Sequence, residues 1–169
     1  MKIKTVLFLI VYKSLYLCIV KYHKMDNIEF HHILPVQIRF NDIDKFGHVN
    51  NTVFFQYYDT AKTDYVVQVC PNVDWEREAI MVVHIESDFI SQIIGECKVG
   101  VRTAVSHIGN KSFTLKQEVY DMETNELKCT CTSIMVAYDL INHQSMLLPE
   151  SWVNAICKFE GKNIATRSK

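Results

Sequence analysis

Five segments of the chain alternate apolar and polar side chains with the two-residue period of a strand that buries one face. The first segment begins at Pro35, where Val36, Ile38 and Phe40 alternate with polar neighbours. The other four segments are residues 79–90, 96–108, 112–122 and 127–140. In the segment 79–90 we expect one buried face, formed by Met81, Val83, Ile85 and Phe89. The pattern therefore predicts five strands.

Residues 51–69 follow the period of a helix instead. Apolar side chains recur there in i, i+4 steps at Val53, Tyr57, Ala61, Tyr65 and Val69, and the stripe is widened by Phe54, Tyr58 and Val66. We predict a helix of about five turns that packs on several sides. Pro71 follows it and prevents its continuation. A second, short helix is expected from about Ser151 to Phe159.

The order of these elements is a strand, a long helix and four strands, joined mostly by tight turns such as the one at Gly109-Asn110. A helix set apart from consecutive strands is typical of an α+β fold with an antiparallel sheet, and not of a doubly wound fold. The helix is expected to lie against the concave face of a curved sheet. Because one helix covers one face, the other face must meet solvent or another subunit.

Composition restricts the classes of function. With 169 residues the chain is long enough for one domain with its own core. Its 18 basic and 19 acidic side chains give a formal net charge of −1, without the basic surface that nucleic-acid binding requires. Neither Cys129 and Cys131 nor His31-His32, which precedes the expected fold, has further ligands at metal-site spacing. We expect a reduced, cytoplasmic protein with no metal and no cofactor.

The first 24 residues differ from the rest. Lys2 and Lys4 precede an apolar run, as in a signal peptide, but Lys13 splits that run into pieces shorter than the ~20 residues that cross a bilayer. No small-residue cleavage site follows. A weak membrane anchor, a signal-like segment and sequence upstream of a start at Met25 stay open, and we favour the last. We expect residues 1–24 to be a dispensable extension without a membrane span, 25–160 to form the domain and 161–169 to be a tail.

Polar side chains crowd the corner between the first strand and the long helix, RFNDIDKFGHVNN, residues 39–51. Gly47 allows a sharp turn, and Asn50 or Asn51 is a good helix N-cap. The N–H groups at a helix start suit a developing oxyanion. Asp42 and Asp44 are therefore candidates for a general base or a nucleophile.

Two other interpretations of this corner remain. Asp and Asn are common in turns, so a well-capped corner without chemistry is about as well supported by the residues alone. Asp42-x-Asp44 is also the pattern of a magnesium-binding phosphotransferase loop. Such a loop follows a central parallel strand with a continuous apolar run, and the alternating VQIRF before this corner disfavours it.

The segment RFNDIDKFGHVNNTVFFQYYDTAKTDYV resembles the opening motif of hot-dog-fold acyl-CoA thioesterases of the 4-hydroxybenzoyl-CoA thioesterase family. The likeness continues through VVHIESDFISQI and VGVRTAVSHIGNKSFTLKQEVYD, and covers roughly Leu34 to Glu150. It implies a hot-dog fold, in which a five-stranded antiparallel sheet wraps a long central helix. It also implies subunits that pair, with acyl-CoA sites at their interface.

The resemblance assigns roles to residues of the corner. It places the catalytic aspartate at Asp44, as nucleophile on the thioester carbonyl or as base for a water. The backbone N–H near Asn51 would polarise that carbonyl, and Gly47, His48 and Asn50 would shape the loop. Asp42 is expected to be a structural hydrogen-bonding partner. Phe46 stands where related plant acyl-carrier-protein thioesterases carry an additional catalytic Asn, so that mechanism is not implied.

Other candidates carry less weight. Lys98, Arg102 and Lys111 are candidate contacts for coenzyme A phosphates, although solvated strand and turn charges are the default interpretation. Phe54, Tyr57 and Tyr58 are expected in the helix core, where some could line an acyl tunnel. His84 is expected to pack rather than to catalyse.

We therefore expect an acyl-CoA thioester hydrolase that forms a homodimer or a dimer of dimers. A hot-dog protein that binds acyl groups without hydrolysis, and an enzyme acting on acyl carrier protein, are the alternatives.

Overall fold

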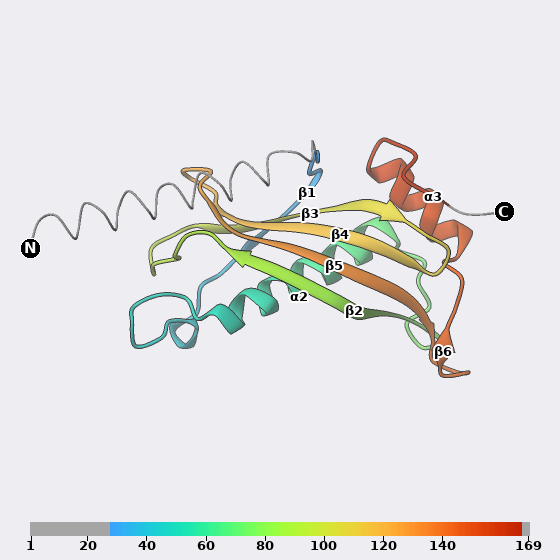
Figure 1. Cartoon of the computed structure of the whole chain (residues 1–169), viewed down its shortest axis with the longest axis horizontal. Coiled ribbons are helices and arrows are strands. Elements are labelled where there is room, and N and C mark those ends of the chain that lie inside the picture. Colours follow the sequence, from blue (N-terminus) through green and yellow to red (C-terminus); the bar gives the residue numbers. More distant parts are fainter. Residues whose placement is uncertain (1–27, 167–169) are drawn as a thin grey trace, which may run out of the picture.

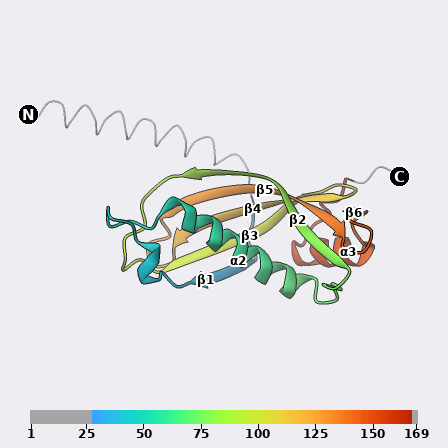
Figure 2. The same cartoon turned by 90° about the horizontal axis from the view of Figure 1, so that it is seen from below.

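The computed structural model describes residues 28–166, and its main feature is a long helix across one face of an antiparallel sheet (Figures 1 and 2). The strands are β1 (His32–Val36), β2 (Glu78–Phe89), β3 (Val99–Ile108), β4 (Ser112–Asp121), β5 (Leu127–Asp139) and β6 (Gln144–Ser145). The helices are the 3-10 turn η1 (Phe40–Asp42), α2 (Asn51–Val69) and α3 (Glu150–Phe159). The sheet order is β1-β3-β4-β5-β2, and the short β6 pairs with β5. The predicted α+β hot-dog architecture is confirmed, with β6 as an unpredicted sixth strand.

Helix α2 has the predicted bounds. It begins after Asn50, whose side chain accepts the Thr52 N–H at 2.9 Å. All eight residues of the predicted apolar stripe are buried. The opposite side is open, since Phe55 and Val67 are 41% and 54% exposed. The expectation that the helix packs on several sides is therefore wrong for the single subunit, because the sheet covers one side only.

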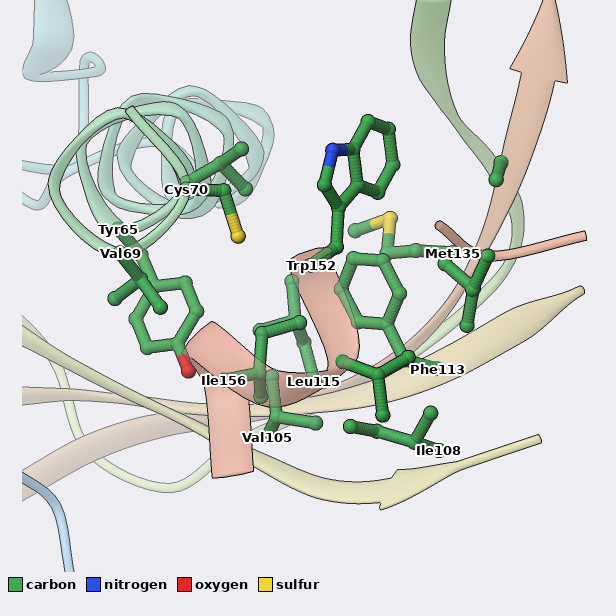
Figure 3. Close-up of a cluster of buried hydrophobic side chains, with 14 of the residues drawn as sticks. Tyr65, Val69, Cys70, Val105, Ile108, Phe113, Leu115, Met135, Trp152 and Ile156 are labelled. Carbon is green, nitrogen blue, oxygen red and sulfur yellow. The ribbon is translucent and has the colours of Figure 1, made fainter. Parts of the chain in front are cut away.

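The core under α2 has two parts. The N-terminal half of the helix packs with the start of β3 and with β5; Val49, Phe54, Tyr58, Val99 and Cys129 belong to this part. The C-terminal half packs with the end of β3, with β4 and with α3, as Figure 3 shows for Tyr65, Val105, Leu115, Trp152 and Ile156. The chain corner that precedes α2 consequently lies at the end of the sheet where β3 begins.

The first strand differs from its prediction. It spans His32–Val36 and not the alternating residues from Pro35 to Phe40. The chain leaves the sheet early because Arg39 and Asp42 close a turn, in which the Asp42 N–H donates to the Arg39 carbonyl at 3.0 Å. Phe40 is therefore 95% exposed. His32 does not precede the fold, since it is buried in β1 and its Nε2 lies 2.8 Å from Asp64 Oδ2.

Strand β2 lies at one edge of the sheet, and its predicted buried face is wrong. The register of β2 against β5 shifts between Val82 and His84, which reverses the alternation of faces beyond that point. Met81 pairs with Val136 and Ile85 pairs with Ser133, so Met81 and Ile85 lie on opposite faces of the sheet. Helix α2 reaches this edge through side chains such as Phe54, whose ring centroid lies 5.4 Å from that of Phe89, but it leaves the predicted face exposed. Met81, Val83, Ile85 and Phe89 are 40%, 61%, 41% and 44% exposed. His84 is exposed as well.

Both ends of the chain bear on the expected domain bounds. Residues 1–24 lie outside the described residues. Within residues 28–166, no helix is long and apolar enough to cross a membrane. The described part of the tail runs along β3, because the Ile108 N–H donates to the Ile164 carbonyl at 3.1 Å and the Thr166 N–H to the Ile108 carbonyl at 2.9 Å.

Candidate active site

Residues 43–49 form a tight loop between β1 and α2. Gly47 has φ of +82°, and its N–H donates to the Asp44 carbonyl at 3.0 Å, which closes a four-residue turn. Ile43 and Val49 pair across the loop, and the Asp44 N–H donates to the His48 carbonyl at 2.9 Å. The sharp turn predicted at Gly47 is confirmed, and it returns the chain directly to the start of α2.

Asp44 lies half-buried in this loop. Its Oδ1 accepts the Phe46 N–H at 2.8 Å, which orients the carboxylate. Among residues 28–166 no hydrogen bond to its Oδ2 is found. One carboxylate oxygen is thus held by the loop, while the other has no hydrogen-bond partner among residues 28–166.

The start of α2 offers a backbone donor beside this loop. The Asn50 side chain caps the Thr52 N–H, and the Asn50 carbonyl accepts the Val53 N–H at 2.9 Å. The Asn51 N–H has no acceptor within the described part of the chain. It therefore stands at the positive end of the helix dipole as a donor for an oxyanion.

His48 and Val49 fasten the loop to the segment before β3. His48 pairs with Ile94, and the Val49 N–H donates to the Ile93 carbonyl at 3.0 Å. Ile94 and Phe46 are 63% and 70% exposed, so large apolar side chains border the loop. The backbone of His48 is thus held in the loop by its pairing with Ile94, and its ring makes no hydrogen bond within residues 28–166.

Asp42 is buried beside the loop and is fully engaged. Its carboxylate accepts the Arg39 N–H at 2.8 Å and the Tyr57 hydroxyl at 3.1 Å, and the Arg39 Nη2 lies 3.1 Å from its Oδ1. Burial would raise the pKa of Asp42, but the hydrogen bonds from Arg39 and Tyr57 outweigh it and hold the pKa below the ordinary 3.8. Burial and the Asp42 charge raise the pKa of Tyr57.

The partners of Asp42 were not singled out in the sequence. The alternation of the first segment predicts Arg39 as an outward-facing strand residue, and the helical stripe predicts Tyr57 as a core residue. No local pattern in the sequence connects either residue to Asp42. A hollow beside these residues is bordered by Asp42 and by the start of α2. It is lined by Arg39, Asn41, Asp42, Asn50, Thr52, Val53 and Gln56.

The three candidate phosphate contacts do not lie together. Lys98 precedes β3 at the loop end of the sheet, where its Nζ lies 2.7 Å from Glu123. Lys111 follows β3, so the strand's ~3.3 Å per residue separates it from Lys98 by on the order of 30 Å. Arg102 is held between them by Glu118, whose Oε2 accepts its Nε at 2.6 Å. One phosphate group in one subunit cannot contact both lysines.

The remaining candidates are core residues. Cys129 and Cys131 face the same side of β5, and both are buried. Burial raises the pKa of Cys131 to about 12. Within residues 28–166 no group of three or more His, Cys, Asp or Glu side chains could hold a metal ion. Phe54, Tyr57 and Tyr58 are buried, as expected for the helix core.

Comparisons with known proteins agree with this arrangement. Residues 38–156 match the family described as the thioesterase-like superfamily. Among curated proteins, the chain is 25% identical to the uncharacterized protein YsmA of Bacillus subtilis (strain 168) over 80 residues, which are 47% of this chain. The chain spans about half the length of that relative, 54%.

Solved structures share the fold. A thioesterase of Thermus thermophilus, crystallised with coenzyme A and Zn, has a TM-score of 0.70 and 26% identity, covering 79% of this chain and 96% of its own. The 1,4-dihydroxy-2-naphthoyl-CoA thioesterase Slr0204 from Synechocystis has a TM-score of 0.66 and 20% identity, covering 75% of this chain and 95% of its own. The PA5185 protein of Pseudomonas aeruginosa strain PAO1 has a TM-score of 0.71 and 20% identity, covering 77% and 92%.

Proposed function

The chain belongs to the thioesterase-like superfamily, and on that premise we propose that it hydrolyses an acyl-CoA thioester to the free acid and coenzyme A. Asp44 acts as nucleophile or general base, and the start of α2 polarises the carbonyl. The observation that carries the proposal is that one short hydrogen-bonded loop carries a half-buried carboxylate, oriented by the Phe46 N–H, and leads directly into the unengaged Asn51 N–H at a helix start. A hydrolase of this kind needs no serine or cysteine nucleophile.

The reaction consumes one water by either route. As a nucleophile, the Asp44 carboxylate attacks the thioester carbon, the C–S bond breaks, and coenzyme A leaves as a thiol after gaining a proton. Water then cleaves the mixed anhydride and restores the carboxylate. As a general base, Asp44 takes a proton from water while the resulting hydroxide attacks the same carbon. In both routes negative charge develops on the carbonyl oxygen, where the Asn51 N–H donates.

The choice of coenzyme A as carrier has specific support. The Thermus thermophilus thioesterase, which is 26% identical to this chain, was crystallised with coenzyme A. In this chain, Lys98 is the candidate phosphate contact that lies at the loop end of the sheet. Lys111 lies too far from the loop within one subunit. Lys98 and Arg102 are each paired with a glutamate, but the Lys98 side chain is 71% exposed and the Arg102 side chain only 27%. An acyl carrier protein is the alternative carrier, and acyl binding without hydrolysis is the alternative function.

A homodimer is part of the proposal. The edge strand β2 exposes Val82, Ile85 and Phe89, and α2 exposes Phe55, which together offer apolar surface that a second copy would cover. Two β2 edges related by a twofold axis would also satisfy each other's backbone groups. Phe89 packs against Phe54, with ring centroids 5.4 Å apart, so this edge adjoins the start of α2. The second subunit would therefore border the site.

Asp44→Asn tests the catalytic assignment. Asn is nearly isosteric but is a much poorer base and nucleophile, so kcat should fall by ~10²–10⁴ while the fold is retained. Steady-state hydrolysis of a panel of aromatic and aliphatic acyl-CoA thioesters measures the loss, with circular dichroism as the check on folding. Asp59→Asn, which changes an exposed carboxylate on α2, is the matched control.

Turnover of Asp44→Asn within threefold of wild type would refute the assignment. Wild-type binding of the thioesters without release of thiol would favour the acyl-binding alternative. Hydrolysis of acyl carrier protein thioesters in place of acyl-CoA would favour the other carrier.

A further inference from the structure

We infer that Asp42 is a positioning residue: together with Arg39 and Tyr57 it holds the loop that carries Asp44 against the start of α2. The inference rests on the proposed function, because it is Asp44 and the Asn51 N–H that need to be positioned. It assigns Asp42 no contact with substrate.

Asp42 connects three parts of the chain. Its Oδ2 accepts both the Arg39 N–H at 2.8 Å and the Tyr57 hydroxyl at 3.1 Å, which joins the segment after β1 to the second turn of α2. Its backbone carbonyl accepts the Asn50 N–H at 2.8 Å, which joins it to the N-cap of the same helix. One buried residue, 2% exposed, therefore fixes the helix start and the loop entrance relative to each other.

The loop 43–49 is consequently anchored at both ends. Asp42 precedes it, Asn50 follows it, and these two residues are hydrogen-bonded to each other. Asp44 lies two residues from the first anchor and Asn51 one residue from the second. A movement of Asp42 would thus change the separation between the carboxylate and the N–H that must act on one carbonyl. A misplacement of ~1 Å in such an arrangement costs ~10²-fold in rate.

Arg39 extends the contact to a further residue of α2. Its Nη2 donates to Gln56 Oε1 at 2.6 Å, and its Nε lies 3.2 Å from Asp42 Oδ1. The guanidinium therefore compensates the buried carboxylate and ties it again to the helix. An uncompensated Asp42 would be a buried charge two residues from Asp44 and would disturb the fold of the loop.

The environment of Asp42 argues against a direct catalytic role. Both of its oxygens are occupied by donors that belong to the fold, whereas Asp44 has an oxygen without a partner in residues 28–166. The hydrogen bonds also keep Asp42 ionised, since they hold its pKa below the ordinary value against the effect of burial. A group that stays ionised and bonded can hold a loop but is a poor acceptor for a proton from water.

The test compares Asp42→Asn and Tyr57→Phe with the wild-type protein and with Asp59→Asn. Asp42→Asn is expected to lower kcat by ~10–100-fold, the range typical of residues that orient a catalytic group. KM should stay within threefold of wild type, and the acidic limb of the pH–rate profile should persist because Asp42 takes no part in the proton transfer. Tyr57→Phe, which leaves the ion pair in place, should show a smaller loss of kcat with the same unchanged KM.

A double variant separates a shared contact from two independent ones. Because Arg39 acts through Asp42, Arg39→Met combined with Asp42→Asn should cost little more than Asp42→Asn alone. Losses that multiply would contradict the inference. A vanished acidic limb in Asp42→Asn would also overturn it, since Asp42 would then be the base itself. A kcat of Asp42→Asn within twofold of wild type would do the same.

Amide hydrogen exchange provides a readout that does not depend on activity. In Asp42→Asn and in Tyr57→Phe, the amides of Gly47, Val49 and Asn50 should exchange faster, while those of Val66 and Val69 in the same helix stay protected. Unchanged exchange in the loop would overturn the inference even in an inactive protein. A wild-type protein that hydrolyses no thioester, but whose loop loosens in these variants, would refute the proposed function and leave the positioning role in place.

Discussion

Asp42 and Asp44 have different environments although one residue separates them. Asp42 is 2% exposed and accepts bonds from Arg39 and Tyr57, whereas Asp44 is half-buried and accepts one bond from the Phe46 N–H. A carboxylate whose oxygens are occupied by the fold stabilises structure, and one with an unoccupied oxygen can receive a proton or attack a carbonyl. We therefore propose that the two aspartates divide structure and chemistry between them.

Asp42→Asn should alter how stability depends on acid pH. The folded-state pKa of Asp42 lies below the ordinary 3.8, so its contribution to the free energy of unfolding is complete above that value. The contribution is lost as the pH falls through the lower folded-state pKa. Wild type should consequently approach the stability of Asp42→Asn as the pH falls below about 4. Urea denaturation at several pH values measures this, and a constant difference over that range would contradict it.

Polar contacts fix α2 and α3 in one position on the sheet. Near the middle of α2, the buried Gln117 of β4 donates from its Nε2 to the Tyr58 carbonyl at 3.0 Å. Toward the other end, Glu160 follows α3, and its Oε1 accepts the Tyr65 hydroxyl at 2.6 Å and the Val105 N–H at 2.8 Å. One buried carboxylate thus connects α2, α3 and β3.

Removal of that carboxylate should destabilise the fold without affecting the loop. Glu160→Ala leaves two buried donors without an acceptor, at ~1–3 kcal/mol each, so the free energy of unfolding should fall by about 2–6 kcal/mol. Urea denaturation measures the change, and Glu96→Ala, at an exposed site, is the control. Tyr65→Phe combined with Glu160→Ala should recover part of the loss. A loss below ~0.5 kcal/mol would mean that Glu160 does not hold α3.

The sheet ends in β1 at one edge and in β2 at the other. The edge of β3 beyond β1 is covered by residues 160–166, because the Val105 N–H donates to Glu160 and the Thr166 N–H to the Ile108 carbonyl. The β2 edge has no such cover within residues 28–166 and exposes apolar side chains. An unpaired apolar edge favours association with another strand. A second copy of this chain is the partner that we propose for it.

Ile85→Lys combined with Val82→Lys should separate the dimer. Two added charges in a paired apolar surface cost more than an association of this kind supplies, so the variant should elute as a monomer with reduced hydrolysis. Size-exclusion chromatography with light scattering measures the mass at micromolar concentration. Ile33→Lys, at a 50% exposed position of β1 at the opposite edge of the sheet, should remain dimeric. An active, stable wild-type monomer would contradict the prediction.

Local patterns in the sequence determined much of this protein. The i, i+4 stripe predicted α2 with its bounds and its eight buried residues, because one apolar face decides how a helix packs. Strict alternation and the turn at Gly109-Asn110 predicted β3, β4 and β5. Gly47 was expected to turn the loop, and it has a positive φ. These features depend on residues close together in the chain, and therefore the sequence alone reveals them.

Tertiary structure decided what depends on distant partners. The side chain of Tyr57 reads as core, and only the fold brings its hydroxyl to Asp42, 15 residues earlier. The turn at Arg39 ends the first strand early, so β1, which begins at His32, stops short of its predicted end. The register shift beside Val82 changes which side chains of β2 face the helix side of the sheet. Both depend on hydrogen bonds and strand pairing that no period in the sequence encodes. The separation of Lys98 from Lys111 likewise follows from the length and direction of β3, which place charges that are near in sequence at opposite ends of the sheet.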